Sequence, residues 1–191
     1  MNTSSLLANQ IWQPTQSLFS VRNLALAVIG SLVVAIAAQI NIPMVPVPMT
    51  LQTLAVLSIG AAFGARLGAA TLALYAVEGA AGLPVFAQMK AGAAIISGPT
   101  GGYIVGFILA AALVGYLAEK GWSRDIPKMV MAALLGAIVL YIPGLVWLHQ
   151  FANGWSQTFE WGITPFILGD VVKAVIAALG FQAAWMSFGK K

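Results

Sequence analysis

Three long stretches of the chain contain no charged side chain, and they constrain its fold more than any other feature. They cover residues 23–65, 91–118 and, apart from His149, 129–159. The hydrocarbon core of a bilayer needs about 20 apolar residues per helix, so each stretch can cross it once or twice. Only 7% of the 191 residues are charged, against about 25% in a typical soluble domain. The sequence therefore predicts an integral membrane protein.

Glycine, proline and charged residues divide the chain into six apolar segments. In lipid every backbone N–H and C=O group must be bonded within its own segment, which favours helices. We predict an all-α integral membrane protein that forms a single membrane domain over residues 1–191, with a polar, interfacial lead-in at 1–21 and a six-helix bundle at 22–187. The six predicted transmembrane helices cover roughly residues 23–41, 50–64, 66–81, 101–118, 129–147 and 164–186.

The basic residues are unevenly divided between the two ends of the predicted helices. If the N-terminus is cytoplasmic, the outer loops contain only Lys90, and the inner stretches contain Arg22, Arg66, Lys120, Arg124, Lys128, Lys190 and Lys191. The positive-inside rule then places both termini in the cytoplasm and the protein in the cell membrane. In this orientation the second, fourth and sixth helices begin at the outer face, where their dipoles favour an anionic ligand.

The sixth predicted helix, which we expect to begin near Ile163, contains an acid and a base one turn apart, Asp170 and Lys173. Their spacing places both side chains on one face of the helix. Such groups cost at least ~2.5 kcal/mol each within a bilayer, so they usually face a bundle interior or a water-filled cavity. We favour a ligand site, and a structural ion pair that holds this helix to its neighbours stays open as the alternative.

Other polar side chains gather at the same predicted outer end: Gln39, Asn41, Thr50, Gln52, Thr53, Tyr75, Glu78, Thr100 and Tyr103. Each alone has an equally good structural explanation, because such residues commonly bond between helices or lie at the membrane interface. Together they predict a cavity that opens outwards. Two outer loops are expected to cap it, residues 42–49 with three prolines and two methionines, and the glycine-containing stretch 82–103.

Small residues recur every fourth position in the first predicted helix, at Ala27, Ser31 and Ala35. This pattern lets another helix approach closely. Docking of a partner protein and an internal helix contact are both consistent with it, and we take the three residues as candidates for partner docking.

Several function classes are disfavoured by what the sequence lacks. It has no phosphate-binding G-x-x-x-x-G-K-[ST] loop, no cysteine, and a single histidine, His149, without carboxylate or thiol neighbours. The basic residues are scattered over the loops rather than gathered as in a nucleic-acid-binding surface. We expect no enzymatic activity, no metal, no cofactor and no nucleic-acid partner.

Four motifs, in this order, resemble the BioY family of biotin transporters, the substrate-specific (S) components of energy-coupling-factor (ECF) systems. They are Val47–Thr53, Gly82–Phe86, Gly98–Tyr103 and Gly169–Lys173, and the resemblance spans about residues 20 to 186. It implies a six-helix membrane fold that binds biotin near the outer face. It also implies a membrane-embedded coupling protein and two cytoplasmic ATPases as partners, although some members work without dedicated partners.

Transferred by motif, the polar biotin contacts fall on Gln52, Tyr103, Asp170 and Lys173, with the first outer loop as a lid. Further ligand candidates are Asn41, Thr50, Tyr75, Glu78, Lys90 and Thr100. One departure is the stretch 87–97, where the resemblance implies glycines and where Lys90 would replace or add a contact.

Biotin has a ureido group, a thioether ring and a carboxylate on an apolar chain. Asp170 is expected to accept from the ureido N–H groups and Lys173 to donate to the ureido carbonyl, and an inverted pose with the carboxylate on Lys173 stays open. The leading hypothesis is a binding and translocation subunit. The alternative is a self-sufficient secondary transporter in which Asp170 or Glu78 takes up a proton.

Overall fold

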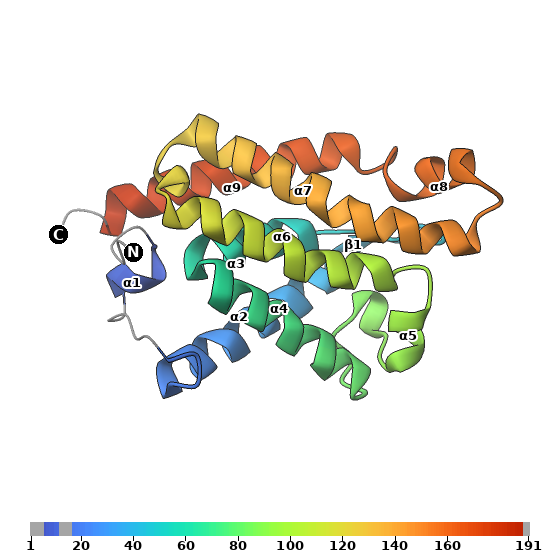
Figure 1. The fold of residues 1–191 in the computed structure, drawn as a ribbon, viewed down its shortest axis with the longest axis horizontal. Coiled ribbons are helices and arrows are strands. Elements are labelled where there is room, and N and C mark those ends of the chain that lie inside the picture. Colours follow the sequence, from blue (N-terminus) through green and yellow to red (C-terminus); the bar gives the residue numbers. More distant parts are fainter. Residues whose placement is uncertain (1–5, 12–16, 189–191) are drawn as a thin grey trace.

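The computed structural model of the protein describes residues 6–11 and 17–188. Within them, each of the six predicted segments forms a helix whose ends lie at most three residues from the expected ones (Figure 1). These helices are α2 (Val21–Gln39), α3 (Gln52–Phe63), α4 (Ala65–Ala80), α6 (Gly101–Glu119), α7 (Ile126–Leu148) and α9 (Ile167–Phe188).

Four helical segments in the described part of the chain are long and apolar enough to cross a bilayer: α2, α6, Ile126–Phe151 and α9. The helices α3 and α4 have 12 and 16 residues, which corresponds to about 18 and 24 Å against a hydrocarbon core of about 30 Å. Only Gly64, at φ 85°, separates the two helices. The chain is thus a multi-pass membrane protein with four full-length candidate spans and one pair of shorter helices.

Shorter elements join these helices. The two-residue strands β1 (Asn41–Ile42) and β2 (Met49–Thr50) pair antiparallel, with Asn41 opposite Thr50. They close the base of the first predicted outer loop. The remaining short elements are α1 (Ala8–Ile11), α5 (Ala93–Ser97), α8 (Trp155–Gly162) and the 3-10 helices Ala87–Met89, Trp122–Arg124 and His149–Phe151.

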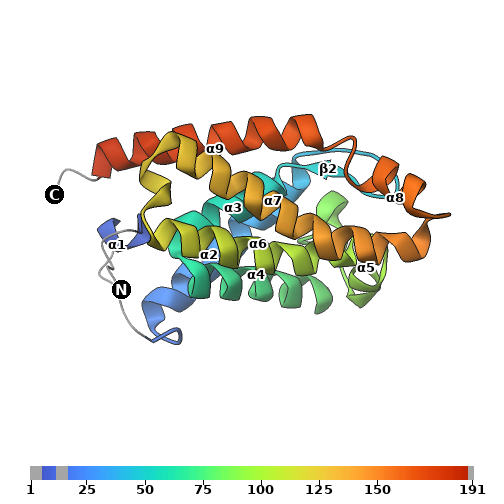
Figure 2. The same cartoon turned by 45° about the horizontal axis from the view of Figure 1, so that its top comes forward.

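The two ends of the bundle differ in the elements found there. Figures 1 and 2 show β1, β2, α5 and α8 at one end, here called the ribbon end, and α1 with the last turn of α9 at the opposite end. The helices α3, α6 and α9 begin at the ribbon end, as predicted for the second, fourth and sixth helices. The positive ends of three helix dipoles therefore lie at the ribbon end.

Small residues let the helices approach closely at the opposite end. The helix α6 contacts α3, α4 and α7, and a methyl group added to Gly60 of α3 would lie 2.6 Å from the carbonyl oxygen of Ala111 in α6. Val56, Leu72, Val114 and Met129 are fully buried around this contact. The contact between α3 and α6 is therefore close-packed.

The expected lead-in lies partly outside the described residues, which exclude 1–5 and 12–16, and the C-terminal Lys190 and Lys191 are likewise outside them. In the described part, Leu6 and Leu7 are buried in the core. The Nη2 atom of Arg22 donates to the Ala8 carbonyl oxygen at 3.1 Å and to Asn9 Oδ1 at 2.9 Å. Residues 6–9 therefore pack on the opposite end of the bundle.

The small-residue ladder of α2 faces inwards, which favours the internal helix contact over partner docking. Ala27 and Ser31 are buried, Ala35 is half-buried, and α2 packs mainly on α4. The Ser31 hydroxyl donates to Glu78 Oε1 of α4 at 3.1 Å. Because the close approach serves the neighbouring α4, these side chains do not form a free surface for a partner.

Candidate ligand-binding cavity

A cavity of about 360 Å³ lies at the ribbon end of the bundle. Residues 43–48 line one side, the first turns of α3, α6 and α9 line its interior, and the loop after α4 lines its mouth. The volume is within the usual range for small-molecule sites. The predicted cavity and its two capping loops thus come together in space.

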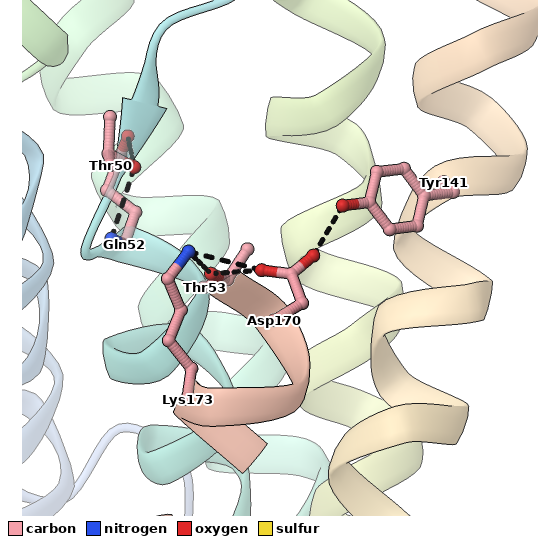
Figure 3. Close-up of polar contacts among 6 residues, drawn as sticks. All are labelled: Thr50, Gln52, Thr53, Tyr141, Asp170 and Lys173. Atoms are coloured by element: carbon pink, nitrogen blue, oxygen red, sulfur yellow. Dashed lines mark hydrogen bonds and ion pairs between the residues drawn. The ribbon is translucent and has the colours of Figure 1, made fainter. Parts of the chain in front are cut away.

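The charged pair lies inside this cavity (Figure 3). Lys173 Nζ lies 3.1 Å from Asp170 Oδ1. Thr53 of α3 bonds to both residues: its hydroxyl accepts from Lys173 Nζ at 2.8 Å and donates to Asp170 Oδ1 at 3.2 Å. The hydroxyl of Tyr141, from α7, donates to Asp170 Oδ2. Three helices therefore hold one buried ion pair.

The ion pair keeps capacity for a ligand. An ammonium group has three N–H bonds, and a carboxylate accepts about four hydrogen bonds. Within the described residues, Lys173 donates to two acceptors and Asp170 accepts from three donors. Lys173 thus retains one N–H bond and Asp170 about one acceptor position for a ligand, and both side chains line the cavity.

The start of α9 determines how deep this pair lies. The helix begins at Ile167, after a turn that contains Pro165, and not near Ile163 as expected from the sequence. Asp170 therefore belongs to the first turn, where its negative charge is favoured by the free N–H groups of the helix. Lys173 lies one turn further into the bundle.

A second polar group lies on the α3 and α4 side of the cavity. Gln52 Nε2 donates to the Tyr75 hydroxyl at 2.8 Å, and that hydroxyl donates to the Val85 carbonyl oxygen at 3.0 Å. Thr50 donates to Gln52 Oε1 at 3.1 Å. These bonds orient Gln52 and Tyr75, which both line the cavity, and connect α3 to the loop after α4.

Tyr103 stands between the cavity and α8. Its hydroxyl donates to the Gly162 carbonyl oxygen at 2.8 Å, and its ring meets the Tyr141 ring edge to face at 6.2 Å. A methyl group at Gly144 would lie 2.8 Å from this ring. The glycine in α7 thus makes the space that Tyr103 occupies.

Most of the predicted ligand residues line the cavity: Thr50, Gln52, Tyr75, Lys90, Thr100, Tyr103, Asp170 and Lys173. Asn41 and Glu78 are not among the residues that line it and instead bond within the bundle. The Asn41 amide donates to the carbonyl oxygens of Ala38 and Gln39 and so caps the end of α2. Glu78 points from α4 towards Ser31 of α2.

Tyr141 is a cavity residue that the sequence analysis did not identify. A buried tyrosine hydroxyl usually needs a hydrogen-bond partner, so a tyrosine within an apolar helix could have indicated a polar site. The apolar walls were also not predicted individually; they include Phe86, Phe107, Leu140 and Phe166. Hydrophobic side chains are too common in this chain for composition to single them out.

The cavity combines two kinds of recognition. The ion pair and Gln52 offer charged and neutral hydrogen-bonding groups at its base, and the phenyl and tyrosyl rings offer flat apolar surface around them. This combination suits a small ligand that has both a polar ring and an apolar part. Among residues 6–11 and 17–188, no three histidine, aspartate or glutamate side chains come together as a metal site.

Comparison with known proteins identifies relatives over most of the chain. A family model described as the BioY family matches residues 10–190. The biotin transporter BioY of Thermotoga maritima is 37% identical over 159 residues, which cover 83% of this chain and 93% of that protein. The biotin transporter BioY of Rhizobium etli is 36% identical over 180 residues, covering 88% of this chain and 96% of that protein.

A solved structure has the same fold. The crystal structure of the S-component for biotin from an ECF-type ABC transporter superposes with a TM-score of 0.75, at 23% sequence identity, and the match covers 89% of this chain and 94% of that one. At this identity the likeness establishes the membrane fold alone. Together with the sequence relatives, it shows that the chain belongs to the BioY family.

Proposed function

We propose that this chain binds biotin at the outer face of the cell membrane and serves as the substrate-binding component of an ECF-type uptake system. The observation that supports this most is the Asp170 and Lys173 pair, which lines the cavity and keeps hydrogen-bonding capacity for a ligand. The relatives that cover more than four fifths of the chain are named biotin transporters. The proposal involves binding and translocation, without covalent chemistry, a metal or a cofactor.

The proposed pose places the ureido group of biotin at the base of the cavity. Asp170 accepts from a ureido N–H group and Lys173 donates to the ureido oxygen, both charge-assisted bonds. The rings of Tyr103 and Phe166 provide flat apolar surface for the bicyclic ring system. The carboxylate then lies near Lys90 at the mouth, and the inverted pose, with the carboxylate on Lys173, is the competing arrangement.

In the proposed topology six helices cross the membrane, with both termini in the cytoplasm. Arg66, Lys120, Arg124 and Lys128 lie at the helix ends opposite the cavity, and Lys90 lies at its mouth. This distribution supports an outward-facing cavity under the positive-inside rule. The short pair α3 and α4 would cross where the bundle, rather than lipid, surrounds it. Cysteine accessibility at residues 90 and 124, probed from each side of the membrane, tests this orientation.

The proposed partners are a membrane-embedded coupling protein and two cytoplasmic ATPases. The resemblance to S components supports this proposal, as does the absence of an ATP-binding phosphate loop from the sequence. Co-purification of this chain with such a module, and ATP-dependent biotin uptake by the reconstituted complex, are the expected results.

Biotin binding by the purified protein is the direct test. We expect Asp170→Asn and Lys173→Ala each to weaken binding severely, measured by calorimetry or by retained radiolabelled biotin. Arg124→Ala is the control, because Arg124 lies over the Trp185 ring at the opposite end. Unchanged affinity in both cavity variants would show that the pair is only a structural ion pair.

A second candidate function is proton-coupled transport by this chain alone. The observation in its favour is Glu78, an acid in the apolar helix α4 that lies outside the cavity and accepts a hydrogen bond from Ser31. Vesicles that contain only this protein separate the two functions. Uptake driven by a proton gradient and lost in Glu78→Gln would favour the secondary transporter, and uptake that requires ATP and partners would favour the ECF component.

A further inference from the structure

The loop after α4 contains two consecutive residues in a conformation that side chains disfavour. Gln88 has φ 61° and Met89 has φ 56°, in the left-handed region where only glycine fits without steric cost. The resemblance to the family implies glycines in this stretch. Such backbone conformations persist only where the surrounding structure enforces them, and they concentrate at functional sites.

The side chain of Gln39, in the last turn of α2, bonds to this turn on both sides. Its Nε2 atom donates to the Phe86 carbonyl oxygen at 3.1 Å, and its Oε1 atom accepts from the Met89 N–H at 3.0 Å. A primary amide offers a donor and an acceptor at one tip, so it can bond to both ends of a tight turn at once. We call these two hydrogen bonds the Gln39 latch.

The latched turn forms part of the cavity mouth, although Gln39 does not line the cavity. Gln88 and Lys90 do line it. The start of the turn is held separately, because Val85 accepts from the Tyr75 hydroxyl and the Phe86 ring meets the Tyr75 ring edge to face at 5.6 Å. The turn itself is closed by the Phe86 N–H, which donates to the Lys90 carbonyl oxygen at 3.1 Å, and the Gln39 latch joins this closed turn to the end of α2.

We propose that Gln39 is a positioning residue: its latch anchors the strained turn to α2 and thereby sets Lys90 at the mouth, where the proposed pose has the carboxylate of the ligand. The identity of the ligand in this inference rests on the proposed function. The structural role of Gln39 in anchoring the turn does not depend on it. Loss of the latch would let residues 88 and 89 relax to negative φ and move Lys90 away from the mouth.

Ligand discrimination tests the positioning role. Gln39→Met keeps the length of the side chain and removes both bonds to the loop. The two ligands to compare are biotin and biotinamide, which differ only in the charge of the carboxylate end. We expect the affinity ratio of biotin over biotinamide to fall about tenfold in Gln39→Met, because the variant loses the charge-assisted contact between Lys90 and the carboxylate of biotin, which biotinamide lacks. Gln182→Met, the same change in the cytoplasmic half of α9, should leave the ratio within about twofold of wild type. An unchanged ratio in Gln39→Met, whether or not both affinities fall, overturns the proposal.

Rescue by glycine distinguishes release of the turn from general damage to the fold. In the Gln39→Met background, Gln88→Gly with Met89→Gly removes the steric reason for relaxation. We therefore expect the affinity ratio of biotin over biotinamide to be at least about threefold higher in the triple variant than in Gln39→Met alone. No recovery would overturn the strained-turn account. If Gln39→Met does not fold, Gln39→Asn replaces it, since its amide is one methylene too short to bond to both ends of the turn.

Hydrogen exchange tests the latch without any ligand. We expect amide exchange in residues 86–90 of the ligand-free protein to be about tenfold faster in Gln39→Met than in wild type, while exchange in α6 stays unchanged. Equal exchange in residues 86–90 would overturn the latch. If wild type binds no biotin but exchange in residues 86–90 is still slower in wild type than in Gln39→Met, the proposed function fails and the structural role of Gln39 stands.

Discussion

The two ends of the bundle are built from the same helices but from different classes of side chain. At the opposite end, glycine and alanine bring α3, α4 and α6 into close backbone contact, as at Gly60 and Ala111. At the ribbon end, these three helices present glutamine, tyrosine and phenylalanine, and α9 adds a charged pair, around a cavity of about 360 Å³. The difference teaches that one apolar scaffold can bring backbones into close contact near one end and form a polar-lined cavity at the other through local choices of side-chain size and polarity.

This comparison predicts that substitutions at the ribbon end change binding, and that substitutions at the opposite end change stability. Dense packing transmits strain and tolerates added atoms poorly. A cavity tolerates a loss of polarity structurally, but we expect it to lose function, because its polar groups are the proposed ligand contacts. The following substitutions separate these two effects.

Replacing the whole ion pair should give the largest effect on binding. We expect Asp170→Leu with Lys173→Met to lower biotin affinity more than about hundredfold, because two charge-assisted bonds worth about 1.5 to 3 kcal/mol each are lost. Its melting temperature should stay near that of wild type, since apolar residues often replace a buried ion pair at no cost. Calorimetry and thermal melting measure the two properties. Retained binding would contradict the ligand role of the pair. Lys173→Met alone should lower the melting temperature, because it leaves Asp170 without its countercharge.

Enlarging Gly60 should give the largest effect on stability. In Gly60→Val the new side chain meets the Ala111 carbonyl, and overpacking of this kind costs about 3 kcal/mol, which corresponds to a melting temperature about 10 °C lower. Gly180→Val is the matched control, because a methyl group added to Gly180 in α9 meets nothing within 4 Å. Equal melting temperatures for the two variants would show that the opposite end is not close-packed.

Removal of one hydroxyl at the ribbon end should give an intermediate effect. Tyr141→Phe deletes the bond to the Asp170 carboxylate and should lower biotin affinity about tenfold, as expected for a hydrogen bond to a charged group. Tyr116→Phe, on an exposed face of α6 near the opposite end, should leave affinity unchanged. A titration of both variants by calorimetry compares them directly, and equal affinities would exclude Tyr141 from the site.

Removal of a cap at the opposite end should give the smallest effect. Glu119 Oε1 accepts from the Ala65 N–H at 3.0 Å and so caps the first turn of α4. Glu119→Ala should cost about 1 kcal/mol of folding free energy, which lowers the melting temperature by about 3 °C, without changing biotin affinity. Glu160→Ala, on the exposed surface of α8, is the matched control. A change in affinity above about twofold for Glu119→Ala would show that the two ends are coupled.

Local sequence was a good guide to helices and a partial guide to the site. Glycine, proline and charged residues placed the ends of the helices to within three residues, because bilayer thickness and backbone hydrogen bonding leave few other solutions. The spacing of Asp170 and Lys173 predicted a shared face, and the structure places both in the cavity. Depth was predicted less well, since the helix start at Ile167 depends on how the turn at Pro165 packs.

Where the sequence left the role of a residue open, the direction of its side chain around the helix was the missing quantity. Glu78 and Tyr75 are close in sequence, yet Tyr75 lines the cavity and Glu78 faces α2. Ala27 and Ser31 formed a pattern that fits either a partner or a neighbour, and α4 occupies that face. Tyr141 gave no local indication of its contact with Asp170.

The sequence by itself determined that the chain is a membrane protein, which segments form its helices and which residues are costly to bury. These properties follow from hydropathy, charge and helical spacing. Only the tertiary structure decided which polar groups meet, as it brings Thr53, Tyr141 and Asp170 together from three helices. The physical reason is that hydropathy is a property of each segment, whereas a binding site depends on the rotation and packing of several segments against one another.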